Sequence, residues 1–593
     1  MRLAGGRALV AMWCALTLSC GAPRPDAPPA GRITPADETL ALAQPCALSN
    51  NVVTVVLSAN ETATLTLDGT GALLVNGQAC GAATQTNARR ITVSVQSPGD
   101  ATDETLVIDG TNGFFGLGSS TGGGITIALG AGTDTVQLIG SAGADVLIAG
   151  RTTTDDWVIV NQDLFKDVSV TGVEALTLTG AGGADLLSGS GLHPTWLRAS
   201  YYSSGLPTQR LLTLEGGAGD DTLVGGEGAD VLRGGTEADA LTGGAGADTL
   251  YGDAGDDLID EGSAASGADV FNGGAGTDTV RYAARSNAVT VTLGSGANDG
   301  EPAEGDDVRD DLEIVVGSSG GDTLTCSITT GCTLRGGPGD DTLTGNSGAD
   351  TLEGEAGDDV LRPGTGADTL LGGAGVDTVT YSDRTGAVTV TLGAPGVAST
   401  GNGAAMEGDS LTDLENVVGG SGADTLTGNS LANRLTGGAG ADTLSGGDGD
   451  DVFDEGAAAN GADVIAGGGG IDRVDYSART TALTVSLDGT ANDGAASEGD
   501  DVEADVERVD GGSGNDTLTG NADANELNGN GGDDTLSGLG GRDVLSGGPG
   551  NDSLAGGEGD DILEDIVDGG TCDCGPGFDI AICPSPGDSC EVR

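Results

Sequence analysis

A glycine- and aspartate-rich unit of nine residues repeats in phase along the chain, and this period limits the possible folds more than any other feature. From Gly216 the sequence reads GGAGDDTLV, GGEGADVLR, GGTEADALT, GGAGADTLY and GDAGDDLID, and the period returns from Gly336, Gly419 and Gly511. Glycines at the first, second and fourth positions permit positive φ angles, as a tight turn needs. The last three residues alternate like a short strand, which would direct Leu250 inward. Each unit therefore predicts a turn and a short strand.

An aspartate at the sixth position of the unit places a hard anionic oxygen beside the carbonyl groups of the turn. Ca²⁺ accepts six to eight oxygen ligands at about 2.3–2.6 Å in flexible mixtures of carboxylate and carbonyl, whereas the smaller Mg²⁺ demands near-octahedral geometry. Each turn is thus a candidate calcium half-site. The sequence assigns this role to the following residues: Asp221, Asp230, Asp248, Asp257, Asp278, Asp341, Asp350, Asp359, Asp368, Asp377, Asp424, Asp442, Asp451, Asp472, Asp516, Asp534, Asp543, Asp552 and Asp561.

These units resemble the RTX, or haemolysin-type, calcium-binding nonapeptide GGxGxDxUx, in which U is a large apolar residue. The resemblance covers well over half of the chain when degenerate copies and the segments between blocks are included. It implies an all-β fold, a parallel β-roll or β-helix solenoid in which two units form one coil. Calcium ions would lie between successive turns, so the resemblance implies several Ca²⁺ ions as cofactors.

The charge of the repeat makes calcium a requirement for folding. Carboxylates on strands stacked about 4.8 Å apart would repel one another by about 1 kcal/mol in water and about 3.5 kcal/mol at an effective dielectric constant of about 20. Burying one leucine returns roughly 2 kcal/mol per unit, before a backbone ordering cost of about 1–2 kcal/mol per residue. We therefore expect the metal-free array to stay loose and Ca²⁺ to supply folding free energy. Permanent disorder and a solvated acidic face are the alternatives.

Two units depart from the pattern and should bind calcium weakly or not at all. In GNSLANRLT, Leu431 replaces the fourth glycine and Asn433 replaces the aspartate. In GNADANELN, Asp523 and Asn525 occupy these two positions. Amide oxygens can still act as calcium ligands, but they carry less charge than a carboxylate.

A longer motif recurs between the nonapeptide blocks, roughly every hundred residues. Each copy, here called a module, has a short strand that ends in a tyrosine, then an alternating strand such as VTVTL from Val289, then an acidic loop such as NDGEPAEGDDV from Asn298. The tyrosines are Tyr282, Tyr381 and Tyr476, and acidic residues hold equivalent places in the loops: Glu304, Asp306, Glu407, Asp409, Glu498 and Asp500. These acids could form a second type of calcium site. A plain solvated loop is the alternative.

The pattern divides the chain into consecutive segments. Residues before Gly216 carry short Val, Ile, Thr and Leu runs and degenerate turns, such as GAGTDTVQL from Gly130, and predict a β-rich, β-helical cap. The expected segments are a signal peptide (1–19), a proline-rich tether (20–30), the β-rich region (31–215), block 1 with the first module (216–335), block 2 with the second module (336–418), block 3 with the third module (419–510), block 4 (511–564) and a cysteine-rich end (565–593).

The amino terminus resembles the export signal of a bacterial lipoprotein. Arg2 and Arg7 precede an apolar run from Ala8 to Leu18 that is too short to span a bilayer as a permanent helix. The sequence LTLSCG then resembles a lipobox with Cys20 as the lipid-bearing residue, although Thr17 departs from the usual leucine. We expect an extracellular or cell-surface protein, an outer-membrane-anchored lipoprotein that touches the membrane only through its lipid. Ordinary signal cleavage near this point is the alternative.

The cysteines predict disulfide bonds. Of the 10 cysteines, Cys14 lies in the expected signal and Cys20 at the expected anchor, which leaves an even number in an exported chain. Their spacing suggests a bridge between Cys46 and Cys80, one between Cys326 and Cys332, and two among Cys572, Cys574, Cys583 and Cys590. Three pairings are open for the last four cysteines, and a zinc site is the alternative there.

The composition limits the possible functions. The formal net charge of −68, from 91 acidic and 23 basic side chains, argues against a nucleic-acid surface. The sole histidine is His193, HExxH is absent, and no G-x-S-x-G elbow precedes a predicted helix. We therefore expect a non-enzymatic surface or matrix protein with a structural or adhesive role, whose partners are calcium ions and a cell-surface or matrix polysaccharide. The alternative is an extracellular enzyme with an RTX tail, in which residues 31–215 would act on acidic polysaccharide.

Overall fold

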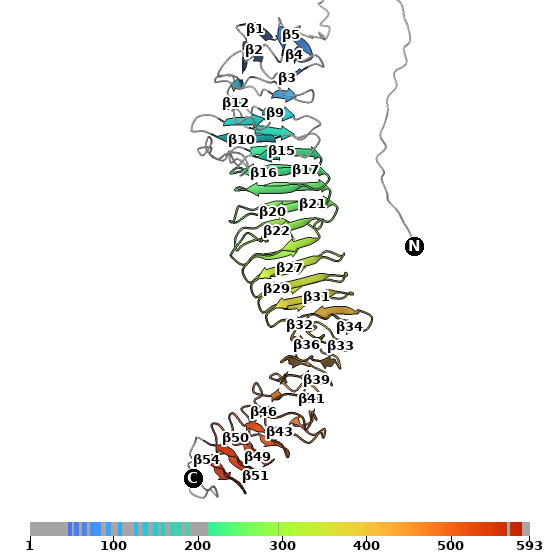
Figure 1. Ribbon diagram of the computed structural model, residues 1–593, viewed down its shortest axis with the longest axis vertical. Coiled ribbons are helices and arrows are strands. Elements are labelled where there is room, and N and C mark those ends of the chain that lie inside the picture. Colours follow the sequence, from blue (N-terminus) through green and yellow to red (C-terminus); the bar gives the residue numbers. More distant parts are fainter. Residues whose placement is uncertain are drawn as a thin grey trace, which may run out of the picture. The chain divides into compact units, whose positions relative to one another are not determined.

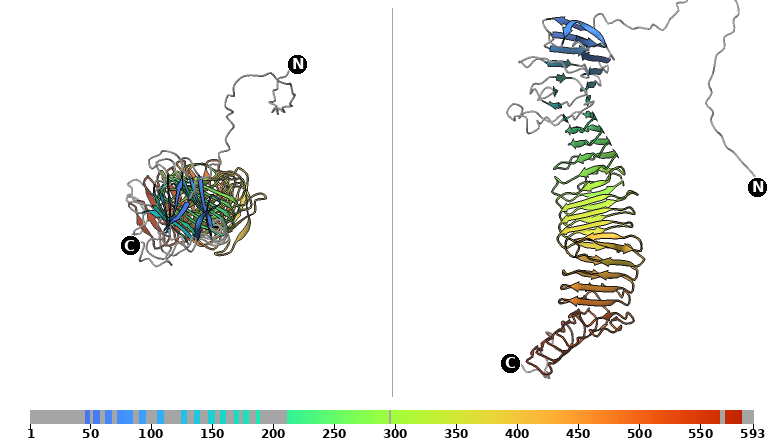
Figure 2. Two further views of the ribbon diagram at one scale, coloured as in Figure 1. Left: turned by 90° about the horizontal axis from the view of Figure 1, so that it is seen from above. Right: turned by 45° about the vertical axis from the view of Figure 1, so that its right-hand side comes forward.

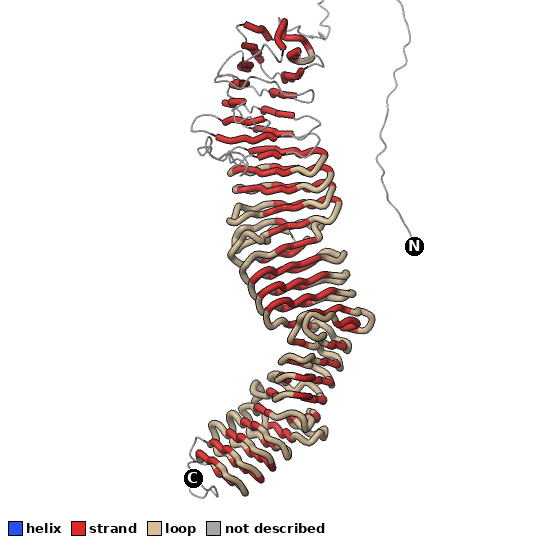
Figure 3. Tube along the Cα trace, viewed as in Figure 1, coloured by secondary structure: helices blue, strands red, loops and turns tan. Residues whose placement is uncertain are grey.

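The computed structural model describes strands within residues 46–188 and most of the chain that follows, residues 211–294, 296–565 and 570–583. These residues form strands, turns and bends, with no helix among them (Figures 1 and 3). The described part of the chain thus contains no apolar helix long enough to cross a membrane. The predicted signal peptide, the proline-rich tether, Cys20, His193 and Cys590 lie outside the described residues.

Two nonapeptides form one coil, and the coils stack in parallel. Strand β15 (Leu211–Ala218) pairs with β17 (Val231–Thr236), and β17 pairs with β19 (Thr249–Ala254), always with leucine opposite leucine. Stacked residues of adjacent coils are 18 positions apart. Figure 2 shows the successive coils lying on one another. The predicted all-β parallel solenoid is therefore confirmed.

The core of the solenoid is a ladder formed by the eighth residue of each unit. Leu223, Leu232, Leu241 and Leu250 are fully buried, and their neighbours along each strand point outward. Burying one leucine contributes roughly 2 kcal/mol. Because each unit buries only one large side chain, a coil depends on the coils above and below it, as in other repeat proteins.

The strands before β15 form a cap that begins with antiparallel pairs and continues as a parallel stack. Its strands are β1 (Cys46–Ser49), β2 (Val52–Leu57), β3 (Thr62–Leu67), β4 (Ala72–Val75), β5 (Gln78–Thr84), β6 (Arg90–Val95), β7 (Thr105–Asp109), β8 (Gly124–Ala128), β9 (Thr135–Ile139), β10 (Val146–Arg151), β11 (Asp156–Val160), β12 (Val168–Thr171), β13 (Ala175–Thr179) and β14 (Leu186–Ser188). β1 and β2 pair antiparallel, as do β3, β4 and β5, whereas β3, β7, β9, β13 and β15 stack in parallel. Later in the cap, β11 pairs antiparallel with both β10 and β12. The predicted β-helical cap is thus present and continuous with the nonapeptide coils.

The remaining strands form five parallel stacks, numbered here in chain order. Stack one continues from β14 with β16 (Thr222–Gly226), β18 (Ala240–Gly244), β20 (Leu258–Asp260), β22 (Thr279–Arg281), β25 (Ile314–Val316), β27 (Thr333–Pro338), β29 (Thr351–Ala356), β31 (Thr369–Ala374) and β35 (Asp409–Thr412). Stack two contains β15, β17, β19, β21 (Val270–Ala275) and β24 (Asp307–Val308).

Stack three is the longest of the later stacks. It contains β23 (Thr290–Leu293), β26 (Thr323–Cys326), β28 (Thr342–Thr344), β30 (Val360–Arg362), β32 (Thr378–Thr380), β36 (Asn416–Val418), β38 (Arg434–Thr436), β40 (Val452–Asp454), β42 (Arg473–Asp475), β46 (Arg508–Asp510), β48 (Glu526–Asn528), β50 (Val544–Ser546), β52 (Ile562–Glu564) and β54 (Ile580–Ile582). Stack four contains β33 (Val388–Thr391), β37 (Thr425–Thr427), β39 (Thr443–Asp448), β41 (Val464–Gly469) and β45 (Asp501–Val502). Stack five contains β43 (Leu483–Ser486), β47 (Thr517–Thr519), β49 (Thr535–Gly540), β51 (Ser553–Glu558) and β53 (Thr571–Asp573). Two further strands form short antiparallel pairs: β34 (Ser399–Ala404) pairs with β35, and β44 (Gly494–Ala495) pairs with β43.

Each module ends one stack and begins another. In the first module, β24 is the last strand of stack two and β23 is the first strand of stack three. The second module ends stack one at β35 and begins stack four at β33. The third module ends stack four at β45 and begins stack five at β43. The modules are therefore the places where the regular nonapeptide stacking is interrupted and restarted.

Disulfide bonds lie in the cap, in the first module's coil and near the carboxy-terminal end. Cys46 bonds Cys80, with Cα atoms 5.3 Å apart, and Cys326 bonds Cys332 at 6.4 Å. The structure also resolves part of the open connectivity, because Cys572 bonds Cys583, and Cys574 is disulfide-bonded as well. The predicted disulfides among these cysteines are confirmed, which argues against the zinc alternative.

Candidate metal sites

The sixth-position aspartates form buried ladders along the coils. Every aspartate that the sequence singles out is between 0% and 2% exposed. In each stack, Oδ1 of one aspartate accepts the backbone N–H of the aspartate one coil earlier, as Asp239 does from Asp221 at 2.7 Å and Asp359 does from Asp341 at 2.8 Å. This bond fixes the side chain inside the turn and leaves only Oδ2 for another partner.

In most turns the second carboxylate oxygen has no hydrogen-bond partner within the described residues, although it is buried. We call these turns open. The second residue of every open turn has a positive φ angle, for example Gly244 (100°) before Asp248 and Glu355 (75°) before Asp359. The open turns hold Asp239, Asp248, Asp257, Asp278, Asp341, Asp359, Asp368, Asp377, Asp442, Asp451, Asp472, Asp534, Asp543, Asp552 and Asp561.

A smaller group of turns satisfies this oxygen internally, and we call these turns capped. Their second residue lacks the positive φ angle and donates its backbone N–H to the sixth-position side chain. The capped residues are Asp230, Asp322, Asp350, Asp424, Asn433, Asp516 and Asn525, with N···O distances between 2.5 and 2.8 Å.

Position in the stack explains the difference between the two groups. Capped turns follow a coil without a nonapeptide turn, so that Asp230, Asp350 and Asp424 accept the N–H of Leu212, Cys332 and Val388 instead of that of an aspartate. Open turns rest on a preceding nonapeptide turn. Where nonapeptide turns stack on one another after a different kind of coil, the first of these turns is thus capped by its own backbone, and the turns stacked on it are open.

The first glycine of each turn makes room for oxygen atoms from two coils. A Cβ atom added at Gly354 would collide with Oδ2 of Asp359 and would lie 2.6 Å from the carbonyl oxygen of Gly372 in the next coil. The same arrangement surrounds Gly216, where Asp221 and the carbonyl oxygen of Gly234 take these roles. Turns of this kind therefore bring a carboxylate oxygen and a carbonyl oxygen of the adjacent coil to one point.

Burial raises the pKa of the ladder carboxyls, and aspartates of adjacent coils raise it further. The pKa of Asp239, of Asp248, of Asp341 and of Asp368 is raised from 3.8 to about 7. Burial also raises the pKa of Asp230, in a capped turn, to about 6, and the backbone N–H groups of Leu212 and Gly226 oppose this rise by stabilising the charged form. Ionised carboxylates are therefore disfavoured in the folded chain unless a cation joins them.

The donor set fits calcium. Hard carboxylate and carbonyl oxygens from two stacked turns, with no nitrogen or sulfur ligand, are the ligands that Ca²⁺ prefers, and it tolerates their irregular geometry. Asp359 Oδ2 and the Gly372 carbonyl would hold one such ion, and the open turns of Asp257, Asp451 and Asp543 repeat this pair. The bound ion would neutralise the ladder and join two coils.

The sequence pattern misses four aspartates that the structure places in the same ladders: Asp239, Asp269, Asp322 and Asp463. Glu237 replaces the fourth glycine before Asp239, and serines disrupt the turn before Asp322. Asp269 and Asp463 follow turns that are three residues longer, so their stacking distance is 21 positions instead of 18. The buried apolar residue two positions later would have identified all four.

Each acidic loop of the modules buries at least one aspartate, although other residues of the loops are exposed. Asp306, Asp409 and Asp500 are fully buried, and the hydroxyls of Tyr282, Tyr381 and Tyr476 donate to them at 3.2, 2.8 and 2.9 Å. These aspartates are shielded because the strand at or next to each of them pairs with the last coil of a stack.

Replacing Gly246 by alanine should disrupt one junction between coils. Gly246 has φ +144°, and its added Cβ would collide with the carbonyl oxygen of Gly228 in the preceding coil. We expect a local loss of about 1–3 kcal/mol, as for other strained backbone positions. Hydrogen exchange of residues 225–251 in calcium measures it. Gly386→Ala is the control, because no atom lies within 4 Å of its added Cβ; equal protection in both variants would contradict the expectation.

Comparison with known proteins agrees with this geometry. No curated protein matches the chain. The family model of the RTX calcium-binding nonapeptide repeat (4 copies) matches residues 213–239, 233–263, 263–280, 333–361, 364–382, 418–453, 458–475, 504–536 and 528–563. These segments contain the open and capped turns described above, except for the capped turn of Asp322 and the first residue of the Asp368 turn. The chain therefore carries RTX calcium-binding nonapeptide repeats.

Proposed function

We propose that the chain is an exported calcium-binding protein whose nonapeptide blocks fold when Ca²⁺ binds. One observation carries this proposal: rows of buried carboxylate oxygens, one per open turn, have no hydrogen-bond partner in the described part of the chain. A buried carboxylate without a partner is strongly disfavoured, and a row of them adds mutual repulsion. Calcium between the coils removes both costs at once.

The consequence is a chain whose order depends on its surroundings. Where calcium is scarce, the ladder carboxylates repel one another and the single leucine per unit cannot hold a coil in place. Where calcium is abundant, as it is outside cells, each ion links two coils and the solenoid becomes rigid. We propose a non-enzymatic structural or adhesive role at the cell surface or in the matrix, with a surface or matrix polysaccharide as the partner to test.

The amino-terminal residues support export and anchoring as part of this proposal. Arg2, Arg7 and the apolar run up to Leu18 suit a signal peptide, and Cys20 suits the lipid-bearing residue of a lipoprotein. Mass spectrometry of the mature amino terminus tests this. A lipid-modified Cys20 is the expected result, and an unmodified terminus would exclude the anchor.

Calcium titration of the mature protein tests the folding proposal. In chelator we expect an expanded chain with weak β-type circular dichroism, and millimolar calcium, roughly the range of extracellular modules, should produce β structure and a smaller radius. Magnesium at the same concentration is the control and should do much less, because it demands smaller and more regular coordination. A spectrum and radius that do not differ between chelator and calcium would refute the proposal.

A further inference from the structure

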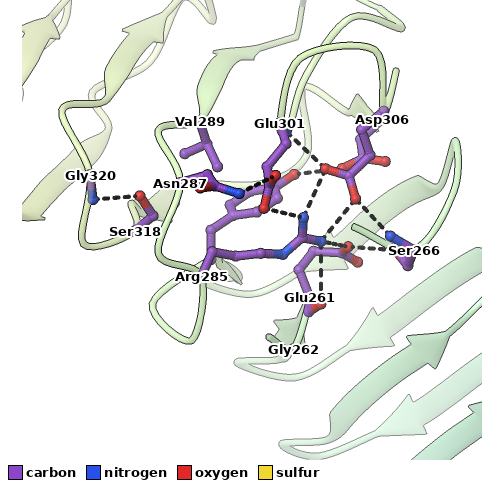
Figure 4. A network of polar contacts seen from close by, with 12 residues as sticks. Glu261, Gly262, Ser266, Arg285, Asn287, Val289, Glu301, Asp306, Ser318 and Gly320 are labelled. Atoms are coloured by element: carbon purple, nitrogen blue, oxygen red, sulfur yellow. Dashed lines mark hydrogen bonds and ion pairs between the residues drawn. The ribbon is translucent and has the colours of Figure 1, made fainter. Parts of the chain in front are cut away.

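The first module buries an arginine among carboxylates at the point where stack two ends. Arg285 is 1% exposed and donates to Glu261 Oε2 at 2.9 Å and to both carboxylate oxygens of Glu304 at 2.9 Å. Glu301 lies at the rim of the group, 3.4 Å from the same guanidinium. Figure 4 shows the guanidinium surrounded by acidic side chains from the turn after β20 and from the acidic loop.

One guanidinium does not balance this group of carboxylates. Carboxylate oxygens of Glu261, Glu304 and Asp306 lie within 4.8 Å of one another. Asp269 faces them, because its N–H donates to Asp306 and because Ser266 Oγ lies 2.8 Å from Asp269 Oδ2 and 3.1 Å from Glu261 Oε2. A hydroxyl has one proton and can satisfy only one of those two oxygens. Four carboxylates thus surround a single buried positive charge.

The third module carries the same types of residue at equivalent positions. Arg479 lies 3.0 Å from Glu498 and 3.8 Å from Glu455. Glu455 and Asp463 are 2% and 0% exposed, and Glu455 Oε1 and Asp463 Oδ2 have no hydrogen-bond partner among the described residues. Burial, with the nearby charges of Asp463 and Asp500, raises the pKa of Glu455 to about 8. The unpartnered oxygens therefore face other carboxylates.

We propose that each of these two clusters binds one calcium ion, at a site distinct from the open turns, where the ladder aspartates Asp269 and Asp463 meet the acidic loops. The ligands are Glu261, Asp269, Glu304 and Asp306 in the first module, and Glu455, Asp463, Glu498 and Asp500 in the third. Oxygens on opposite sides of Ca²⁺ lie up to about 5 Å apart, and those around Mg²⁺ up to about 4 Å. The oxygens of the first cluster all lie within 4.8 Å of one another, which is within the calcium limit, and an all-carboxylate ligand set of irregular geometry suits calcium better than magnesium.

The second module is a natural control because it lacks the buried glutamate. Its turn before Asp368 begins at Pro363 and keeps the regular stacking distance of 18 positions, so it has no counterpart of Glu261. Arg384 contacts Glu407 at 3.2 Å and the exposed Asp383 at 2.7 Å. With fewer carboxylates around the arginine, this module holds no such calcium site.

The position of the tyrosines allows a direct test with Tb³⁺, which replaces Ca²⁺ at oxygen sites and emits when an excited aromatic ring lies close by. The hydroxyls of Tyr282 and Tyr476 bond Asp306 and Asp500, two of the proposed ligands. The full-length double variant Glu261→Gln/Glu455→Gln should therefore lose the larger part of the tyrosine-sensitised emission. It should also bind two calcium ions fewer per chain by native mass spectrometry.

The controls separate this inference from the proposed function, on which it does not rest. Glu353→Gln/Glu526→Gln removes the same charge from glutamates that pair with Arg335 and Arg508 on the outer surface, and it should leave emission and calcium count unchanged. A wild-type chain that does not respond to calcium at all would overturn the proposed function. An unchanged calcium count in a glutamine variant that folds with calcium would overturn this inference alone. Protons, and not calcium ions, would then neutralise the clusters.

A second variant keeps the inference testable if the glutamine variant does not fold. Tyr282→Phe/Tyr476→Phe keeps every proposed ligand and removes only the two phenol hydroxyls beside them. It should retain the calcium count of the wild type while its sensitised emission falls, because phenylalanine is a poor sensitiser. Emission equal to that of the wild type would overturn the inference, since the bound Tb³⁺ would then lie elsewhere.

Discussion

Replacing Asp534, Asp543, Asp552 and Asp561 together by asparagine should abolish the calcium-induced folding of the last nonapeptide block. All four occupy open turns, where the buried Oδ2 has no other partner among the described residues. Asparagine keeps the oxygen that accepts the N–H of the preceding coil but removes the negative charge that holds a divalent cation. Hydrogen exchange with calcium present should show residues 511–564 unprotected. The blocks from Gly216 and Gly336 should respond as before, because repeats couple mainly to their neighbours.

The capped turns supply a control with the same change of charge. Replacing Asp230, Asp350, Asp424 and Asp516 by asparagine should have a much smaller effect, because each side chain already accepts an N–H from its own turn. The chain itself carries asparagine at two capped turns, Asn433 and Asn525, and at none of the described open turns. Equal loss of protection in both quadruple variants would contradict the distinction between open and capped turns.

The period of the sequence was sufficient to predict the coil, the buried leucine and the parallel stacking. These features depend on residues within one unit, because glycine permits the turn and alternation selects the inward side chain. The distinction between open and capped turns could not be predicted in this way. The units of Asp230 and Asp248, GGEGADVLR and GGAGADTLY, have equivalent glycines and aspartates, and they differ in the coil that precedes them.

The spacing of residues in the sequence is also insufficient to predict the carboxylate clusters of the modules. The loop acids Glu304 and Asp306 are visible as equivalent positions in the sequence. Their arginine and the other two carboxylates come from other parts of the chain, since Glu261 is 24 residues from Arg285 and Asp269 is 37 residues from Asp306. Only the three-dimensional stacking brings the lengthened turn and the acidic loop together. The longer turns that precede Asp269 and Asp463 are the sequence signal that would have pointed to these clusters.

Acidification of the metal-free protein should increase its β structure, which is the opposite of ordinary acid denaturation. The pKa of Asp239, of Asp248, of Asp341 and of Asp368 is about 7 in the folded chain, against the ordinary value of 3.8. Because the folded pKa is raised, ionisation destabilises the folded state. The penalty is absent below about pH 4, grows between about pH 4 and 7, and is complete above about pH 7. The β-type circular dichroism of the chain in chelator should therefore rise as pH falls from 8 to about 4.

With saturating calcium the same carboxylates should reverse this dependence. Calcium needs the ionised form, so protons compete with it, and the calcium-induced signal should weaken as pH falls through the same window. The two titration curves, in chelator and in calcium, should therefore converge at low pH and diverge above about pH 7. A chelated chain whose β signal does not change between pH 8 and about pH 4 would show that the buried ladder of carboxylates does not control folding.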